Sequence, residues 1–462
     1  MFENGLFIFR RDFRIVDNIG LLITAARCKR VYTIFVFTPE QVGKSNSYRS
    51  NNAIQFMIES LQDLAGEISK QGGKLLCFYG SNDAVVAACI RAWNINYVGF
   101  NQDYTPYALE RDHSLDSVCK KLGVPMESAQ DYYLHAPGSI LNGSGGPYQK
   151  FTPYYNVASK KHVDAPHAKR NLHLVYSKSP SNVRTISLDE ALTTMVKPRP
   201  NAHILVHGGR PQGLQHLKEA IKTQRNYAKT RNNLYSHTSL LSAYIKFGCV
   251  SIREVYAALK SQKELIRQIY WREFYINVLY AFPNVLTQSM KPNARKITWH
   301  HNERWFQAWC NGETGFPVID AGMRELNTTG YMHNRARLIV ATFLAKTLLI
   351  NWKKGEHYFA TRLTDYDPAS NNLNWQWCAS TSVDSEPYYR ITNPWIQSEK
   401  FDPDAEYIKK WVPELEHVSA KDIHQWNEVW KDYTKTTKYP KPICDYSAQK
   451  ELALRMYRNA LK

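Results

Sequence analysis

The sequence of 462 residues lacks several patterns that mark common structural sites. Its eight cysteines are scattered without a C-x-x-C pair, which argues against a disulfide framework and against a zinc site. No run approaches the roughly 18 apolar residues of a membrane span, and the opening "MFENGLFIFRRDFR" places charge directly after a short apolar run, unlike a secretory signal. We therefore expect an intracellular protein, cytoplasmic or nuclear, with no bound metal.

The motifs of several large enzyme classes are also missing. The chain has no G-x-S-x-G elbow, no H-E-x-x-H pair and no P-loop. No G-x-G-x-x-G follows the first apolar run, so the common dinucleotide fingerprint is absent. His300, His301 and His333 have no partners at metal-ligand spacing, which favours structural or surface histidines.

Nearly all of the excess of basic over acidic residues lies in one part of the chain. The formal net charge is +18, from 59 Lys and Arg against 41 Asp and Glu. Residues 1–130 carry 14 basic and 13 acidic residues, so 45 basic and 28 acidic residues lie in the remainder. A generally basic composition is one explanation of this excess. The other is that the C-terminal two-thirds binds a polyanion, most simply nucleic acid.

The distribution of apolar residues predicts an α/β domain followed by a helical one. Short β-rich runs alternate with helical patterns, as in a parallel sheet, with runs at 5–10, 31–37, 74–80 and 96–101 and helices at 51–70 and 82–93. Residues 131–204 are rich in Gly, Pro, Ser, His and Lys and show little periodicity. Helical periodicity dominates after that. We predict an α/β domain over 1–130, a connector over 131–204 and a large all-helical domain over 205–462.

Aromatic, amide and carboxylate side chains are concentrated in one stretch of the helical part, "LTDYDPASNNLNWQWCAS" (363–380). Core packing and turn capping explain such residues singly. The alternative is a site that holds an aromatic and charged ligand. The hydroxyls of "HTSLLSAYIKFG" (237–248) suit a helix cap or a bound phosphate, and the residues alone leave both open.

Four longer motifs resemble those of the photolyase/cryptochrome superfamily: "YWREFY" (270–275), "GETGFPVIDAGMRELNTTGYMHNRAR" (312–337), the stretch 363–380 and "YYRITNPWIQSEKFDPDAEYIKKWVPEL" (388–415). They are most similar to class I cyclobutane pyrimidine dimer photolyases. "FIFRRDFRIVDN" resembles the family's first strand and the turn after it, with Phe9 where tryptophan is usual. The resemblance covers nearly the whole chain and fades only in the connector.

The resemblance implies that FAD binds, folded, within the helical domain. The residues implied around its phosphates are Tyr227, Thr238, Ser239, Leu240, Leu241 and Ser242. Those implied beside the flavin and ribose are Arg337, Asp365, Tyr366, Asp367 and Asn371, with Arg337 paired to Asp365. The amide oxygen of Asn371 would accept from a protonated flavin N5, which favours reduced flavin.

The resemblance also assigns roles to five tryptophans. Trp375, Trp352 and Trp299 match an electron-transfer chain from the flavin to the surface, and Trp271 and Trp377 match the pair that encloses a flipped lesion. The side chains implied at the phosphates beside the lesion are Arg231, Arg335, Arg390 and Lys400. For Lys400, ordinary surface basicity is an equal alternative.

The reaction implied is light-driven repair of UV-damaged DNA, in which reduced FAD gives an electron to a cyclobutane dimer and the ring splits. Three residues are expected at the lesion, Gln268, Asn334 and Leu338, and two of them depart from the class I pattern. Gln268 replaces a glutamate, so it can donate a hydrogen bond but cannot act as an acid. Leu338 replaces a methionine. Six-four photolyases carry glutamine at the first position, but their two histidines are Asn334 and Leu338 here, so we expect dimer repair.

Six-four repair, a cryptochrome-type light receptor and a nucleic-acid-binding flavoprotein without repair activity are the alternatives. The basic helical domain, Asn371 and the end of the chain at "ELALRMYRNALK" favour the repair enzyme. Many relatives bind a second, light-harvesting chromophore, a folate or a deazaflavin. "DYTPYALERD" (103–112) lacks the Asn-Glu pair of folate-binding bacterial enzymes, so the chromophore's identity stays open. We expect a monomer that acts on DNA and not at a membrane.

Overall fold

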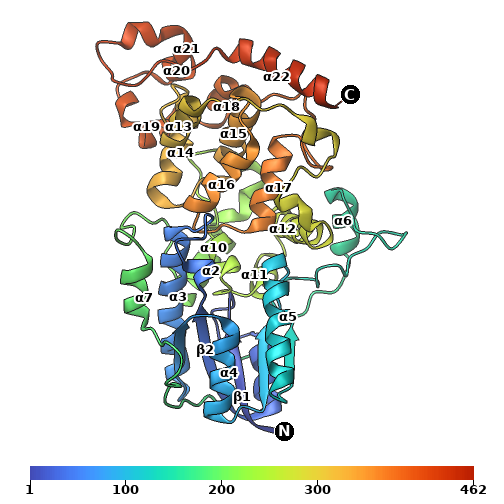
Figure 1. The fold of residues 1–462 in the computed structure, drawn as a ribbon. Coiled ribbons are helices and arrows are strands. Elements are labelled where there is room, and N and C mark those ends of the chain that lie inside the picture. Colours follow the sequence, from blue (N-terminus) through green and yellow to red (C-terminus); the bar gives the residue numbers. More distant parts are fainter. Residues whose placement is uncertain (462) are drawn as a thin grey trace.

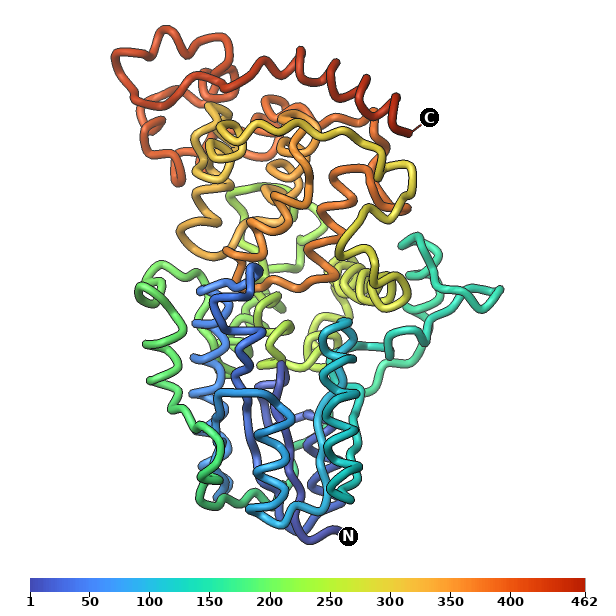
Figure 2. The backbone as a smooth tube through the Cα atoms, viewed as in Figure 1, coloured from blue at the N-terminus to red at the C-terminus, as the bar shows by residue number. Residues whose placement is uncertain are grey.

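The computed structural model describes residues 1–461, which form a sheet-containing part and a helical part stacked along one axis (Figure 1). The N-terminus lies at the free end of the sheet and the C-terminal helix at the opposite end of the molecule (Figure 2). Five parallel strands pair in the order β3-β2-β1-β4-β5, namely β1 Phe2–Phe9, β2 Cys28–Phe37, β3 Leu75–Tyr79, β4 Tyr97–Asn101 and β5 Met126–Ala129. The predicted fold class is confirmed.

Helices cover the sheet, as expected of βαβ units. They are α1 Ile19–Arg27, α2 Pro39–Val42, α3 Asn51–Ser69, α4 Asn82–Trp93 and α5 Pro106–Lys121. The four predicted strands are all present, with β1 and β2 each beginning three residues earlier than predicted. Strand β5 was not predicted, because its four residues, MESA, lie at the sheet edge and only Ala129 is buried. An edge strand without a buried face needs no run of apolar residues, so the pattern that predicts a strand is missing from its sequence.

Two eight-residue helices, α6 (Phe151–Ala158) and α7 (Leu188–Met195), lie in the segment 131–204, where the sequence shows little periodicity. The ring of Phe151 stacks on Trp271 of the helical part, with centroids 3.7 Å apart. Helix α7 begins at the Ser187 cap, whose hydroxyl accepts from the Glu190 N–H, and packs on α3. Packing and capping, rather than a long apolar pattern, therefore form these helices.

The rest of the chain is mainly helical. Its helices are α8 Arg210–Thr223, α9 Tyr227–Thr230, α10 Ser242–Lys246, α11 Ile252–Leu259, α12 Lys263–Ala281, α13 Glu303–Asn311, α14 Pro317–Thr329, α15 Asn334–Thr342, α16 Trp352–Arg362, α17 Pro368–Cys378, α18 Pro394–Phe401, α19 Glu406–Trp411, α20 Ala420–His424, α21 Trp426–Val429 and α22 Tyr446–Leu461. A π-helical turn, Phe343–Thr347, follows α15. Across residues 1–461, every helix is too short or too polar to cross a bilayer.

A buried ionic cluster joins the turn after β1 to the helical part. Asp131 accepts from Arg14 at 2.6 Å and from Arg253 of α11 at 2.7 Å, and Arg253 also contacts Asp17 at 3.1 Å. Although burial opposes the shift, these guanidinium groups hold the pKa of Asp131 below its ordinary value. Paired charges of this kind are costly to break once buried. The cluster therefore fixes the sheet against the helical domain that contains the site.

Candidate functional site

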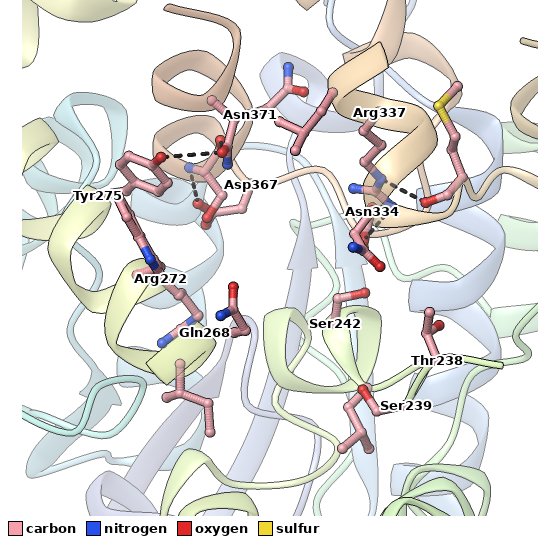
Figure 3. A pocket seen from close by; sticks show the side chains of 18 of the residues that line it. Thr238, Ser239, Ser242, Gln268, Arg272, Tyr275, Asn334, Arg337, Asp367 and Asn371 are labelled. Atoms are coloured by element: carbon pink, nitrogen blue, oxygen red, sulfur yellow. Dashed lines mark hydrogen bonds and ion pairs between the residues drawn. The ribbon is translucent and has the colours of Figure 1, made fainter. Parts of the chain in front are cut away.

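A cavity of about 800 Å³ lies in the helical part, within the range of cofactor sites. Its walls come from α10, α12, α15 and α17 and from the segment before α10 (Figure 3). Most of the residues predicted to bind cofactor or lesion line it: Tyr227, Arg231, Thr238, Ser239, Leu241, Ser242, Gln268, Trp271, Asn334, Arg335, Arg337, Leu338, Asp365, Tyr366, Asp367, Asn371, Trp375 and Trp377. Residues up to 150 positions apart in the chain are thus brought to one cavity.

Five predicted residues do not line the cavity. Leu240 lies between two residues that do, with a left-handed φ of 52°. Trp352 is buried and Trp299 is half-buried, both in the packing around the cavity. Arg390 and Lys400 are exposed on the surface. The positions of Trp352 and Trp299 are compatible with an electron-transfer path that leads away from the cavity. The positions of Arg390 and Lys400 are compatible with a contact to DNA outside the cavity.

The inner wall of the cavity contains the predicted ion pair. Arg337 Nη2 lies 3.0 Å from Asp365, whose side chain is 4% exposed, and Arg337 Nε donates to the Met332 carbonyl at 2.9 Å. Burial opposes the charge of Arg337, but Asp365 outweighs it and raises the pKa of the guanidinium above its ordinary value. The ion pair and the bond to Met332 therefore hold the Arg337 guanidinium in one orientation.

Asn371 of α17 is oriented by hydrogen bonds to Glu356 of the preceding helix, α16. Its Nδ2 donates to the backbone carbonyl of Glu356 at 3.0 Å and to the Glu356 carboxylate at 2.9 Å. Tyr48, in the loop before α3, donates to the same carboxylate at 3.0 Å. Burial raises the pKa of Glu356. Because both amide hydrogens are engaged, the amide oxygen is the group of Asn371 left for a ligand in the cavity.

Asp367 connects the cavity to the sheet domain. Its carboxylate caps α17 by accepting from the Ser370 N–H at 3.0 Å, and it also accepts from Tyr104 at 3.2 Å and lies 3.5 Å from Arg11. Lys246 lines the cavity nearby, and burial lowers its pKa to about 8. The sequence prediction missed Lys246, although it follows Ser242 by one helical turn in the same quoted stretch.

The hydroxyl groups before α10 do not cap that helix. Helix α10 begins at Ser242 with Leu241 at the N-cap, and no side chain there accepts from its N–H groups. Ser242 instead pairs with Tyr331, their oxygens 3.2 Å apart. Figure 3 shows Thr238, Ser239 and Ser242 on one side of the cavity, across from Gln268 and Arg272 of α12. Of the two alternatives left open by the sequence, ligand binding is thus favoured over capping.

A second group of lining residues, which we call the mouth, combines aromatic rings with cations and amides: Arg231, Gln268, Trp271, Asn334, Arg335, Leu338 and Trp377. Trp271 is covered on one face by Phe151, which leaves its other face for an aromatic ligand. One turn earlier on α12, Gln268 Nε2 donates to the Glu264 carbonyl at 3.3 Å. Arg335 lies 4.6 Å above the ring of Phe401. Cations and rings in this combination suit stacked bases and phosphates.

The three tryptophans predicted to transfer electrons lie in or against one hydrophobic cluster beside the cavity. Trp375 lines the cavity, and its ring lies so close to Gly355 that a Cβ there would collide with it. Gly355 is one turn after Trp352, which begins α16. Trp299 adjoins His300, whose N–H donates to the Leu349 carbonyl at 2.7 Å, just before α16. Trp375 and Trp352 are buried, with 2% and 1% of their surface exposed, whereas Trp299 is half-buried.

Within the described residues 1–461, no group of three His, Cys, Asp or Glu is placed to hold a metal ion, and the eight cysteines are unpaired.

Comparison with known proteins identifies the family. A model of the DNA photolyase domain matches residues 6–171, and a model of the FAD binding domain of DNA photolyase matches residues 265–459. The deoxyribodipyrimidine photo-lyase of Halobacterium salinarum is 33% identical over 98% of this chain and 99% of its own length.

Two solved structures extend the likeness to the fold. An archaeal photolyase from Sulfolobus tokodaii with two FAD molecules is 38% identical, with a TM-score of 0.88 over 99% of this chain and 100% of that one. A bacterial class III photolyase from Agrobacterium tumefaciens is 31% identical, with a TM-score of 0.92 over 100% of this chain and 98% of that one. The chain belongs to the DNA photolyase family.

Proposed function

We propose that the chain repairs UV-damaged DNA with light, splitting cyclobutane pyrimidine dimers by means of FAD bound in the cavity. The observation that carries this proposal is one cavity with two unlike ends. Its inner wall presents the fixed Arg337–Asp365 pair and the free amide oxygen of Asn371, and its mouth presents Trp271 and Trp377. The curated relatives named deoxyribodipyrimidine photo-lyase support the same activity.

The residues present fit FAD. Thr238, Ser239 and Ser242 offer hydroxyls for its phosphates, and the cations of Lys246 and Arg337 balance negative charge in the cavity. When bound and reduced, FAD supplies the electron that light drives to the dimer. The amide oxygen of Asn371 would accept from the N–H at flavin N5, and Glu356 holds it in that orientation. Asn371 thereby favours the reduced cofactor.

The mouth would receive the flipped dimer. Extruding a damaged pair from the duplex costs a few kcal/mol, and stacking on Trp271 and Trp377 offsets that cost. Gln268 and Asn334 would hydrogen-bond the base edges, with Leu338 in apolar contact. The phosphates beside the lesion would be bound by Arg231, Arg335, Arg390 and Lys400. Asn334 and Leu338 stand where six-four photolyases carry two histidines, which favours dimer repair over six-four repair.

Trp375, Trp352 and Trp299 would carry an electron from the surface to oxidised flavin. The close approach of Trp375 to Gly355, one turn after Trp352, and the partial exposure of Trp299 support this role.

Defined oligonucleotides containing one dimer or one six-four product test the proposal. The reduced protein should restore the dimer in proportion to absorbed light and leave the six-four product and the dark sample unchanged. Six-four repair without dimer repair would reverse the substrate assignment. Repair of neither lesion would replace the enzyme by a receptor or a DNA-binding flavoprotein.

We further propose that the chain is an intracellular monomer divided at residues 1–130, 131–204 and 205–462. A second chromophore is supported by the two FAD molecules of the Sulfolobus tokodaii photolyase. Whether a folate, a deazaflavin or another group serves here is decided by the near-UV absorption of the purified protein. The assignment to class I stays a prediction, since the structural relatives include a class III photolyase.

A further inference from the structure

A second cavity, of about 360 Å³, lies apart from the first, where the start of α3, the segment 197–201, α14 and the end of α16 meet. It shares no lining residue with the FAD cavity. Its volume falls near the lower limit of small-molecule sites. These four segments thus enclose a separate space.

The charge of this second cavity is entirely positive. Arg49, Lys197, Arg199 and Arg362 line it, and no lining residue is Asp or Glu. Across residues 1–461, none of these four cations forms an ion pair. Four like charges around one cavity repel one another, and an anion between them would remove that cost. The positive charge of these four side chains is therefore not neutralised by acidic residues of the protein.

Arg49 is the least exposed of these four cations, and its contacts show that a negative partner is missing. Arg49 is half-buried, and its guanidinium donates to the carbonyls of Val42 and Met195 and to the amide oxygen of Asn51, with no carboxylate among these partners. Burial lowers the pKa of Arg49 below its ordinary value. Charged groups taken partly out of water are normally paired. Arg49 thus leaves a charge that its protein partners do not neutralise.

The walls of the cavity are held independently of these charges. Asn51 Nδ2 donates to the Lys197 carbonyl at 2.6 Å, and Asn52 Nδ2 donates to the Arg362 carbonyl at 2.7 Å. Both contacts use the backbone of the cationic residues and leave their side chains available. The cavity also lies at the N-terminus of the 19-residue helix α3, whose first turn has no acidic residue, so the helix dipole adds to the positive potential.

We propose that this second cavity binds a small phosphate-bearing anion, of the class of orthophosphate or pyrophosphate, between Arg49, Lys197, Arg199 and Arg362. Guanidinium groups match phosphate oxygens in charge and in hydrogen-bond geometry. No aromatic residue lines the cavity, so it offers no stacking surface for a base. The cavity accordingly recognises the phosphate groups of its ligand. The bound anion lies between the sheet part and the helical part and bridges them.

Calorimetric titration of the FAD-loaded protein with pyrophosphate, and separately with orthophosphate, tests this site at constant ionic strength. FAD loading occupies the phosphate-binding groups of the first cavity. We expect saturable binding to one site, weakened at least about tenfold in the double variant Arg199→Gln and Arg362→Gln. Both side chains are exposed, so the variant should keep its FAD content. The matched control, Lys74→Gln with Lys121→Gln, removes two exposed and unpaired charges elsewhere and should leave binding unchanged.

Absence of saturable binding to either anion, or equal weakening in both double variants, would overturn the proposal. A third outcome concerns DNA. If saturating pyrophosphate displaced damaged DNA, and if the Arg199 and Arg362 double variant lost DNA affinity equally, the cavity would belong to the DNA backbone and not to a small anion. We expect DNA affinity to change by less than about threefold in both measurements, because the lesion side lies at the first cavity.

Discussion

The inner wall and the mouth of the FAD cavity contain similar types of residue. They differ in how closely the charged and amide side chains are paired with other protein groups. In the inner wall, Arg337 faces Asp365 at 3.0 Å and Asn371 is tied to Glu356. At the mouth, Arg335 lies over an aromatic ring, and the nearest carboxylate to Arg231 is at 3.9 Å. Beyond the mouth, Arg390 and Lys400 are exposed.

The difference separates two tasks. A closely paired charge is fixed in place, so it can orient a resident cofactor, whereas a cation that is weakly paired or exposed keeps its attraction for a polyanion that comes and goes. Removing a charge should therefore affect stability and cofactor retention at the inner wall but DNA affinity at the mouth.

The largest effect is expected from Asp365→Asn. Loss of the carboxylate leaves the Arg337 guanidinium without its partner, and breaking such a pair costs about 3 kcal/mol. We expect the variant to lose FAD during gel filtration and to unfold at lower urea concentration. The matched change at the mouth, Glu264→Gln beside Arg231, should cost less than about 0.5 kcal/mol. Equal losses in the two variants would remove the distinction between wall and mouth.

A pH effect of similar size is expected at His333, the N-cap of α15 between wall and mouth. Burial, helped by the charges of Arg335 and Arg337, lowers the pKa of His333 from 6.5 to about 4. The unfolded chain therefore takes up a proton that the folded chain does not, and the free energy of unfolding falls by up to about 3 kcal/mol as the pH drops through this window.

His333→Asn keeps a capping side chain and removes the titration. Urea unfolding at pH 7 and pH 4.5 should show a smaller loss of stability in the variant than in the unmodified protein. Parallel losses would show that His333 does not contribute to the pH dependence.

Trp352→Phe tests the path that leads out of the inner wall. Photoreduction of oxidised FAD should slow at least tenfold, about 1.4 kcal/mol in activation free energy, while repair by chemically reduced protein persists. Trp309→Phe is the matched control, since Trp309 is also buried and lies 6.1 Å from Trp375. Absorbance of oxidised flavin under continuous light gives both rates. Equal slowing in the two variants would contradict a path through Trp352.

The smallest effect is expected beyond the mouth. Arg390→Ala should weaken binding to damaged duplex by about 1 kcal/mol and reduce the slope of log affinity against log salt by about 1, with FAD content unchanged. Lys121→Ala in the sheet part is the control and should alter neither quantity. A fluorescence titration at several salt concentrations measures both. An unchanged slope in the Arg390 variant would remove it from the DNA contact.

The residues of the site were predicted from the resemblance of whole motifs to the photolyase/cryptochrome superfamily. That resemblance, and not spacing along the chain, grouped Arg337 with Asp365 and Asn371. Long helices and buried strands were predicted from the residues themselves, because each repeats its own apolar period.

Contacts across long separations could not be predicted in this way. Tyr48 and Glu356 meet over 308 residues, and Tyr104 and Asp367 over 263. Nothing in the composition of either segment marks its partner, because the pairing depends on how the sheet docks on the helices. The second cavity is hidden for the same reason, since its cations come from segments that only the folded chain brings together.

The decay of excited reduced flavin, measured with and without a dimer in bound DNA, tests most directly that the inner wall and the mouth serve one reaction. With undamaged duplex bound, the decay should match that of the free protein. With a dimer at the mouth, the decay should shorten as the electron leaves for the dimer, and the restored pyrimidines should rise in proportion. An unchanged decay, with damaged DNA shown to be bound, would contradict the placement of flavin and lesion in the same cavity.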